Sequence, residues 1–127
     1  MDDSGRTDDS AALGPIAALS GLLSVAFGAF AAHGMSNHLE AQSLLRTGAQ
    51  YEAIHALAAL AALALIASPR GRMLTAWLFL LGSVLFCGSL YALALGAPRI
   101  TGAITPVGGL LFMAGWASFA WSLRRAK

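Results

Sequence analysis

The sequence predicts an all-α membrane protein, a bundle of four transmembrane helices that takes up nearly the whole chain. Four long stretches contain no Asp, Glu, Lys or Arg; they lie between Asp9 and Glu40, Ala53 and Pro69, Met73 and Pro98, and Ile100 and Leu123. A hydrocarbon core about 30 Å thick takes roughly 20 apolar residues per helix. Hydrophobic residues make up 57% of the chain and charged residues 11%, which is too little charge for the surface of a soluble domain.

The beginning of the chain predicts a retained first span behind a polar tail. We expect a disordered acidic tail over 1–11, a single four-helix domain over 12–123, and a basic cytoplasmic tail over 124–127. The first helix is expected from about Ala12 to Gly34, with Pro15 in its first turn, where its missing N–H costs nothing. Because the tail is acidic and the apolar run exceeds the length of a signal-peptide core, we do not expect cleavage.

The second span is the hardest to place. Ala53 to Ser68 is too short to cross a bilayer, so the helix must recruit Gln50, Tyr51 and Glu52. Before it, Asn37 is followed three residues later by Glu40, a weak variant of the capping box that opens a helix. We therefore predict a short interfacial helix between the first two spans, within 35–49. A direct extension of the second helix into this segment is the alternative.

The remaining spans have clearer signals. Residues 68–72 form a basic turn that joins the second helix to a third over about 73–95, so these two helices are expected to be antiparallel neighbours. The fourth helix is expected to begin with Thr105 as the N-cap, followed by Pro106 at the first helical position, and to end before Arg124.

The distribution of basic residues predicts the orientation. Four passes put both termini and the 68–72 turn on one side of the membrane. That side carries six basic residues, namely Arg6, Arg70, Arg72, Arg124, Arg125 and Lys127, whereas Arg46 and Arg99 lie on the other. The positive-inside rule therefore predicts cytoplasmic termini. Trp77 and Trp121 then fall near the cytoplasmic ends, and Tyr51 and Tyr91 near the outer ends, as interfacial aromatics do.

Small residues recur where helices can approach closely. The first span carries Ser20, Ser24, Gly28 and Ala32 at four-residue spacing, and the last two spans carry Gly82, Gly88, Gly108, Gly109 and Gly115. Such residues favour helix association in lipid. We expect a compact bundle within one chain, with a homodimer face as the alternative.

Polar residues are expected to gather in the outer leaflet. The candidate cluster consists of His33, Gln50, Tyr51, Glu52, His55, Arg99 and Thr105. Glu52 and His55 are three residues apart, so both can lie on one side of the helix. A charge in the membrane costs about 2.5–3.5 kcal/mol even on lenient scales, so Glu52 should be paired, with Arg99 and His55 as candidate partners.

Two interpretations of this cluster compete. A carboxylate and a histidine together can exchange protons, which would suit an ion or ligand site. In the interpretation that we favour, the cluster is a structural latch, because Glu52 in a first turn and His33 in a last turn both complement the helix dipoles. His33, His55 and Glu52 only just reach the three ligands of a metal site, and the two histidines are expected too close together to bind haem. We expect no metal and no cofactor.

The remaining function classes are expected to be excluded. No catalytic motif is present, and Gly108-Gly109 is interpreted as helix packing, so we do not expect an enzyme. The pI of about 9.2 could suggest nucleic acid binding. However, the basic residues lie at helix ends, so we expect no nucleic acid partner. The lipid bilayer is the expected partner, and other membrane proteins or a second copy are further candidates.

Four short motifs carry a family resemblance over about 14–123. They are Gly28-Ala-Phe-Ala-Ala-His33-Gly34, Gln50-Tyr-Glu-x-x-His55-Ala-Leu57, Phe86-Cys-Gly-Ser-Leu-Tyr91 and Ile104-Thr-Pro-Val-Gly-Gly109. The chain resembles the YgdD-like family of small inner-membrane proteins, domain of unknown function four-hundred-and-twenty-three. The resemblance implies a multi-pass protein of the bacterial inner membrane and no known activity. The family usually has Gly where Ala31 stands and commonly Gln where Glu52 stands, which implies that a charge at position 52 is not essential to any shared function.

Three functions are therefore considered. The first is a non-enzymatic structural or accessory component of the inner membrane. The alternative is a small oligomeric transporter or ion-coupled carrier that uses the polar cluster in the outer leaflet. Against it, the other three spans contain no mid-membrane carboxylate. A haem- or metal-binding redox subunit is the third and weakest hypothesis.

Overall fold

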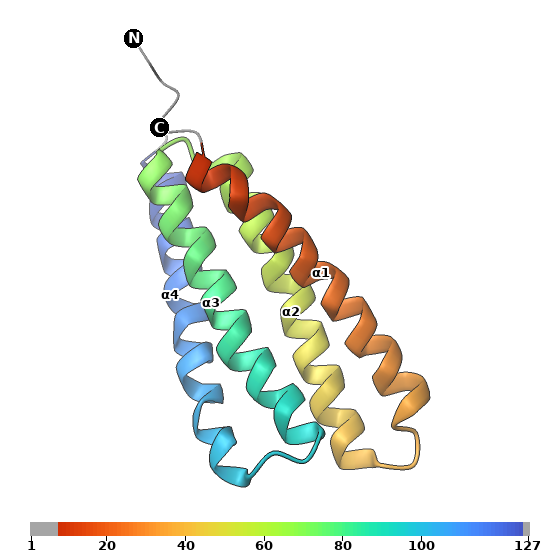
Figure 1. Cartoon of the computed structure of the whole chain (residues 1–127). Helices are drawn as coiled ribbons and strands as arrows, with labels where there is room; N and C mark the ends of the chain where they lie inside the picture. The colour runs from red at the N-terminus through yellow and green to blue at the C-terminus, as the bar shows by residue number, and fades with distance from the viewer. Residues whose placement is uncertain (1–7, 126–127) are drawn as a thin grey trace.

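Four long helices make up the fold (Figure 1). The computed structural model describes residues 8–125. Its elements are α1 (Asp8–Gly34), α2 (Leu39–Leu65), α3 (Pro69–Ala94), the short 3-10 helix η1 (Arg99–Ala103) and α4 (Thr105–Arg124). Within this range, four helical segments are long and apolar enough to cross a membrane. The prediction of an all-α protein with four spans is confirmed.

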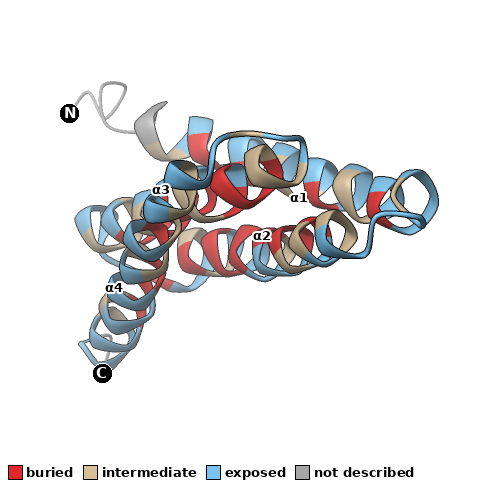
Figure 2. Cartoon of the chain, turned by 90° about the horizontal axis from the view of Figure 1, so that it is seen from below, coloured by how far each residue is buried: buried red, intermediate tan, exposed pale blue. Residues whose placement is uncertain are grey.

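The helices form an open row. Each long helix packs along its neighbours in the sequence, so that α2 and α3 are central and α1 and α4 lie at the edges (Figure 2). α1 also touches α3, and α4 touches α2 slightly, but α1 and α4 make no contact anywhere in residues 8–125. The predicted bundle is therefore not a closed ring of four helices, and α1 and α4 each have one broad face outside the protein.

The helix ends and connections gather at two opposite ends of the molecule. The start of α1, the end of α4 and the turn between α2 and α3 lie together at one end (Figure 1). The connection between α1 and α2 lies at the other end, together with η1. This is the arrangement that four antiparallel passes require, and it puts Arg70, Arg72, Arg124 and Arg125 at the end that holds the termini.

α1 begins earlier than expected, at Asp8, and Pro15 lies inside the helix rather than in its first turn. The predicted disordered tail lies outside the described residues over 1–7. At the other end, α4 continues to Arg124, and residues 126–127 of the predicted basic tail lie outside the described range.

The predicted interfacial helix between the first two spans is absent from this part of the chain. α2 runs without interruption from Leu39 to Leu65, so the alternative, a direct extension of the second helix, describes the structure. The extension packs as part of the fold: Leu45 is fully buried, and Gln42 Nε2 donates a hydrogen bond of 2.9 Å to the carbonyl oxygen of Ala31. As a result, Glu52 lies in the middle of α2, thirteen residues from either end.

The starts of α3 and α4 differ in part from expectation. Ser68 caps α3, its Oγ accepting a hydrogen bond of 3.3 Å from the Gly71 amide, so the basic residues after it belong to the first helical turn. Thr105, predicted as the N-cap of α4, does not cap the helix with its side chain. Its hydroxyl instead lies 2.6 Å from Ser89 Oγ on α3. Pro106, predicted at the first helical position, lies one position later, in the first turn of a helix that begins at Thr105.

Glycines set the contact between α3 and α4. A Cβ atom on Gly108 would collide with the backbone of Phe86, so the two helices touch there almost without side chains. Gly82 makes room for the ring of Phe112, which is within 2.6 Å of the position of a Cβ. Gly88 has no such role, because nothing lies within 4 Å of its Cβ position. Close approach of small residues is the expected way for helices to associate in lipid.

Candidate functional site

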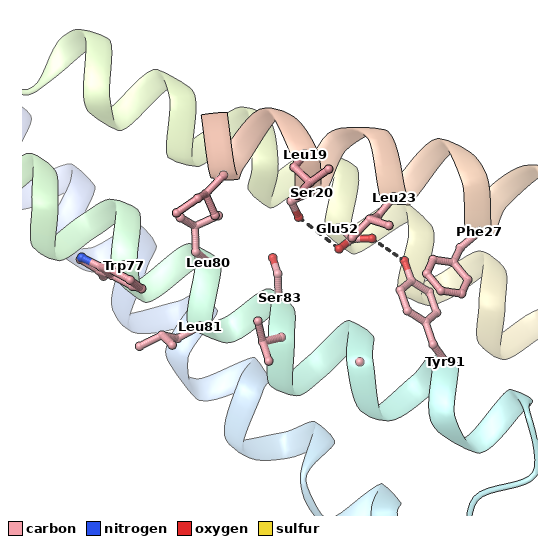
Figure 3. Close-up of a pocket in the computed structure, with 13 residues that line it drawn as sticks. Leu19, Ser20, Leu23, Phe27, Glu52, Trp77, Leu80, Leu81, Ser83 and Tyr91 are labelled. Carbon is pink, nitrogen blue, oxygen red and sulfur yellow. Dashed lines mark hydrogen bonds between the residues drawn. The ribbon is translucent and has the colours of Figure 1, made fainter. Parts of the chain in front are cut away.

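Glu52 is the centre of the most unusual polar arrangement in the described residues. Its side chain is only 6% exposed, in the middle of a helix that is about 40 Å long at 1.5 Å per residue. Tyr91 on α3 donates a hydrogen bond of 2.9 Å to Oε1, and Ser20 on α1 donates one of 3.1 Å to Oε2. The carboxyl group therefore connects three helices, α1, α2 and α3 (Figure 3).

Tyr91 reaches Glu52 because two neighbours hold its ring. Gly48 lies one turn before Glu52 on the same face of α2, and a Cβ atom there would be 2.6 Å from Tyr91 Cε1. On the α1 side, the ring of Phe27 stacks on Tyr91 with a centroid distance of 3.8 Å. A glycine and an aromatic ring thus form a slot that aims the phenol at the carboxyl group.

His55 lies on the side of α2 that faces α4. Its Nδ1 lies 2.7 Å from the carbonyl oxygen of Tyr51, and its Nε2 accepts a hydrogen bond of 3.2 Å from Trp116 Nε1 on α4. A carbonyl oxygen only accepts and an indole N–H only donates, so the hydrogen is on Nδ1 and the ring is neutral. The ring also stacks on Phe112 at a centroid distance of 3.5 Å. His55 therefore links α2 to α4.

The structure does not bring the seven predicted residues together. Glu52 and His55 are buried but bind groups on different helices, and neither Arg99 nor His55 is among the hydrogen-bond partners of Glu52. His33 at the end of α1, Gln50 and Tyr51 on α2, and Arg99 in η1 are exposed, and Thr105 binds Ser89. No three of the described His, Cys, Asp and Glu side chains are arranged to hold a metal ion.

A groove between α1 and α3 opens beside Glu52 (Figure 3). We call it the α1/α3 groove; its walls are mainly Ile16, Leu19, Leu23, Trp77, Leu81 and Val84, and its floor is Ser20, Glu52, Ser83 and Tyr91. Its volume is about 350 Å³, within the roughly 300–1,000 Å³ of small-molecule sites. The groove exists because α1 packs on α2 and meets α3 only slightly.

Ser83 gives this groove an unsatisfied polar group. Its side chain is 4% exposed, and its Oγ has no hydrogen-bond partner. The hydroxyl lies on the α3 side of the groove and points toward the space near Glu52 (Figure 3). Buried hydroxyl groups usually have a partner, because an unmade hydrogen bond costs free energy.

Sequence reasoning missed three residues of this arrangement. Ser20 was noticed only as a small packing residue, Tyr91 as an interfacial aromatic, and Ser83 not at all. The sequence does contain one signal. Gly48 and Glu52 are four residues apart, so a residue without a side chain lies next to Glu52 on the same face of the helix. That pattern suggests space reserved for a large side chain from a neighbouring helix.

Fold and site define a class of protein: a small multi-pass membrane protein with its polar side chains buried between helices. The chain belongs to the family described as "Protein of unknown function (DUF423)", whose model matches residues 27–109. It is 45% identical over 115 residues to "UPF0382 membrane protein" of Haemophilus influenzae, covering 88% of this chain and 93% of the relative.

Further relatives come from distant bacteria. The chain is 43% identical over 109 residues to "UPF0382 inner membrane protein YgdD" of Escherichia coli, covering 80% of each chain. It is also 43% identical over 106 residues to "UPF0382 membrane protein YwdK" of Bacillus subtilis, covering 80% of this chain and 86% of the relative. No solved structure matches. The family membership predicted from the four motifs is confirmed, and it assigns no activity.

Proposed function

We propose that this protein is a non-enzymatic structural or accessory component of the bacterial inner membrane. The observation that carries the proposal is the use of its buried polar groups. Glu52 binds Ser20 and Tyr91, and His55 binds Trp116. Thr75 Oγ1 lies 2.7 Å from Ser118 Oγ, and Ser89 binds Thr105. Each of these bonds joins two helices, so the polar side chains serve to fix helix positions.

The open row leaves exposed helix faces on α1 and α4 to which a partner protein could bind. α1 presents Leu22 and Val25, which are 63% and 69% exposed, and α4 presents Met113 at 68%. At this depth, these side chains meet lipid or another transmembrane helix. A partner helix, or a second copy, could pack on either edge without displacing any contact inside the chain.

An inner-membrane location with cytoplasmic termini belongs to the proposal. It is supported by the printed name of the Escherichia coli relative and by the basic residues at the end of the row that holds the termini. Single cysteines at Ser68 and Ser36, both exposed and at opposite ends, would test it in a Cys87→Ala background. We expect a membrane-impermeant maleimide to label position 36 but not position 68 in intact spheroplasts. The reverse pattern would contradict the orientation.

Co-purification tests the accessory role directly. The full chain, tagged at its C-terminus, is isolated in mild detergent and its companions are quantified by mass spectrometry. Two variants put a bulky side chain on one edge each: Val25→Trp on α1 and Met113→Trp on α4. We expect one companion to be lost from one variant and retained by the other. A preparation that carries no companion, and no second copy, in repeated experiments would contradict the proposal.

One observation favours the alternative, a small oligomeric carrier. Glu52 lies at the middle of α2 and beside the α1/α3 groove. Ionisable residues at that depth commonly mark ion or substrate paths. Proton flux into liposomes that contain the protein, compared with a Glu52→Gln variant, tests this function. Equal flux in the two preparations would remove it.

A further inference from the structure

We propose that the α1/α3 groove binds a lipophilic cation, that is, a molecule with one positive charge and an apolar body, which enters sideways from the bilayer. The inference concerns binding alone. Binding of such a cation is compatible with an accessory component and with a carrier, so it does not rest on either function proposed above.

The carboxyl group of Glu52 is the feature of the groove that would attract a cation. Glu52 is the one acidic residue between Glu40 and the end of the chain. No Lys, Arg or His among the described residues pairs with it; its partners are two hydroxyl groups. A carboxylate offers about four acceptor positions, and two are used here. Because a charge in the membrane is usually paired, a cation in the groove would complete the site.

The hydroxyl of Ser83, which has no hydrogen-bond partner, belongs to the same groove. Its Oγ is buried, lacks a partner and points into the same space as Glu52 (Figure 3). A hydroxyl beside a carboxyl group can accept from an N–H or orient a bound charge. Ser83 on α3 and Glu52 on α2 thus both face a groove whose walls are mainly apolar (Figure 3).

The apolar walls of the groove indicate that the body of the ligand is apolar. Leu19, Leu81 and Val84 are 55%, 47% and 67% exposed and form an apolar rim. Trp77, at 43%, adds an indole face, which attracts cations as well as apolar groups. The groove volume of about 350 Å³ matches a molecule with several rings or a short alkyl chain. The acyl chain of a lipid would suit the walls but leave Glu52 and Ser83 unsatisfied.

Tetraphenylphosphonium is a suitable probe, because it is a permanent cation with four apolar rings. Tetraphenylborate has nearly the same shape and the opposite charge, so it serves as the matched control. The full chain is purified in detergent, and binding of each radiolabelled ion is measured by equilibrium dialysis. We expect saturable binding of the cation and none of the anion.

Paired variants locate the site. Glu52→Gln keeps the size and the acceptor oxygen but removes the charge, and we expect the affinity for the cation to fall at least about tenfold. Glu40→Gln, an exposed position outside the groove, should leave affinity unchanged. Gly88→Leu should also weaken binding, because Gly88 lines the groove and its Cβ position is open. Gly21→Leu, equally open but not part of the groove lining, is its control.

Several results would overturn the inference. They are the absence of saturable cation binding, equal affinity in the Glu52→Gln or Gly88→Leu variant, and anion binding as tight as that of the cation. The last result would indicate an apolar groove for acyl chains or for a neighbouring helix. If Glu52→Gln does not fold, Gly88→Leu decides alone. Failure here would leave the co-purification result intact, because that experiment measures protein contacts.

Discussion

Tyr91 donates a hydrogen bond of 2.9 Å to Glu52, and this bond links the two central helices, α2 and α3. Together with the bond from Ser20, it gives each carboxyl oxygen of Glu52 one partner. The carboxyl group is thus held from both sides while one face remains directed at the α1/α3 groove.

Tyr91→Phe should destabilise the protein by about 1–3 kcal/mol, because it leaves a buried carboxyl oxygen without a donor. Thermal unfolding in a constant detergent measures the change. Tyr51→Phe is the matched control, since Tyr51 is 41% exposed and is not one of the two residues that donate to Glu52. Equal stability of the two variants would show that the Tyr91 bond adds nothing.

Gly48→Ala should also destabilise, by about 1–3 kcal/mol, because the added methyl group would push the ring of Tyr91 out of its slot. The control is Gly21→Ala, where nothing lies within 4 Å and a helix-favouring residue should be neutral or stabilising by up to about 1 kcal/mol. If the variant at position 48 is as stable as the one at position 21, the slot is not needed. Circular dichroism during heating gives both values.

Gly108 and Gly109 form a pair of adjacent positions with opposite expectations. Gly108→Ala should separate α4 from α3, because its Cβ would overlap the backbone of Phe86, and backbone cannot move aside as a flexible side chain can. We expect a loss of about 2 kcal/mol or more, or failure to fold. Gly109→Ala should be tolerated, since its nearest neighbour is a ring atom of Phe86 at 3.8 Å. Yield and melting temperature of the two variants provide the comparison.

His55 should be the neutral tautomer with its hydrogen on Nδ1, because Nε2 accepts from Trp116. Nitrogen-15 NMR of the histidine side chain distinguishes this form by its ring shifts. Trp116→Phe retains an aromatic ring but removes the donor, and should cost about 0.5–1.5 kcal/mol. An Nε2-protonated ring in the unaltered protein would contradict the assignment.

The spans could be predicted from composition, but their boundaries could not. Long charge-free stretches fix the number of helices, because each crossing needs enough apolar length. Residues 35–49 contain Glu40 and Arg46, so the sequence predicts a loop with a short interfacial helix there. From Leu39 onward it is continuous with α2, because most of its residues are good helix formers and because Leu45 packs into the core.

Two residues of the candidate site, Glu52 and His55, could be predicted from the sequence, but their partners could not. Glu52 and His55 are three positions apart and so differ by about 60° around the helix axis. On an edge helix both would face one neighbour. On the central α2 this angle is enough to send Glu52 toward Ser20 and Tyr91, and His55 toward Trp116. The sequence carries no information on which helix occupies the centre of the row.

The absence of contact between α1 and α4 bears on how the protein comes apart under mechanical force. Each outer helix packs mainly against one neighbouring helix, whereas α2 and α3 each pack against helices on two sides. Pulled from its ends in a bilayer, the chain should therefore lose its first and last helices one at a time, and the hairpin should be extracted last as a single unit.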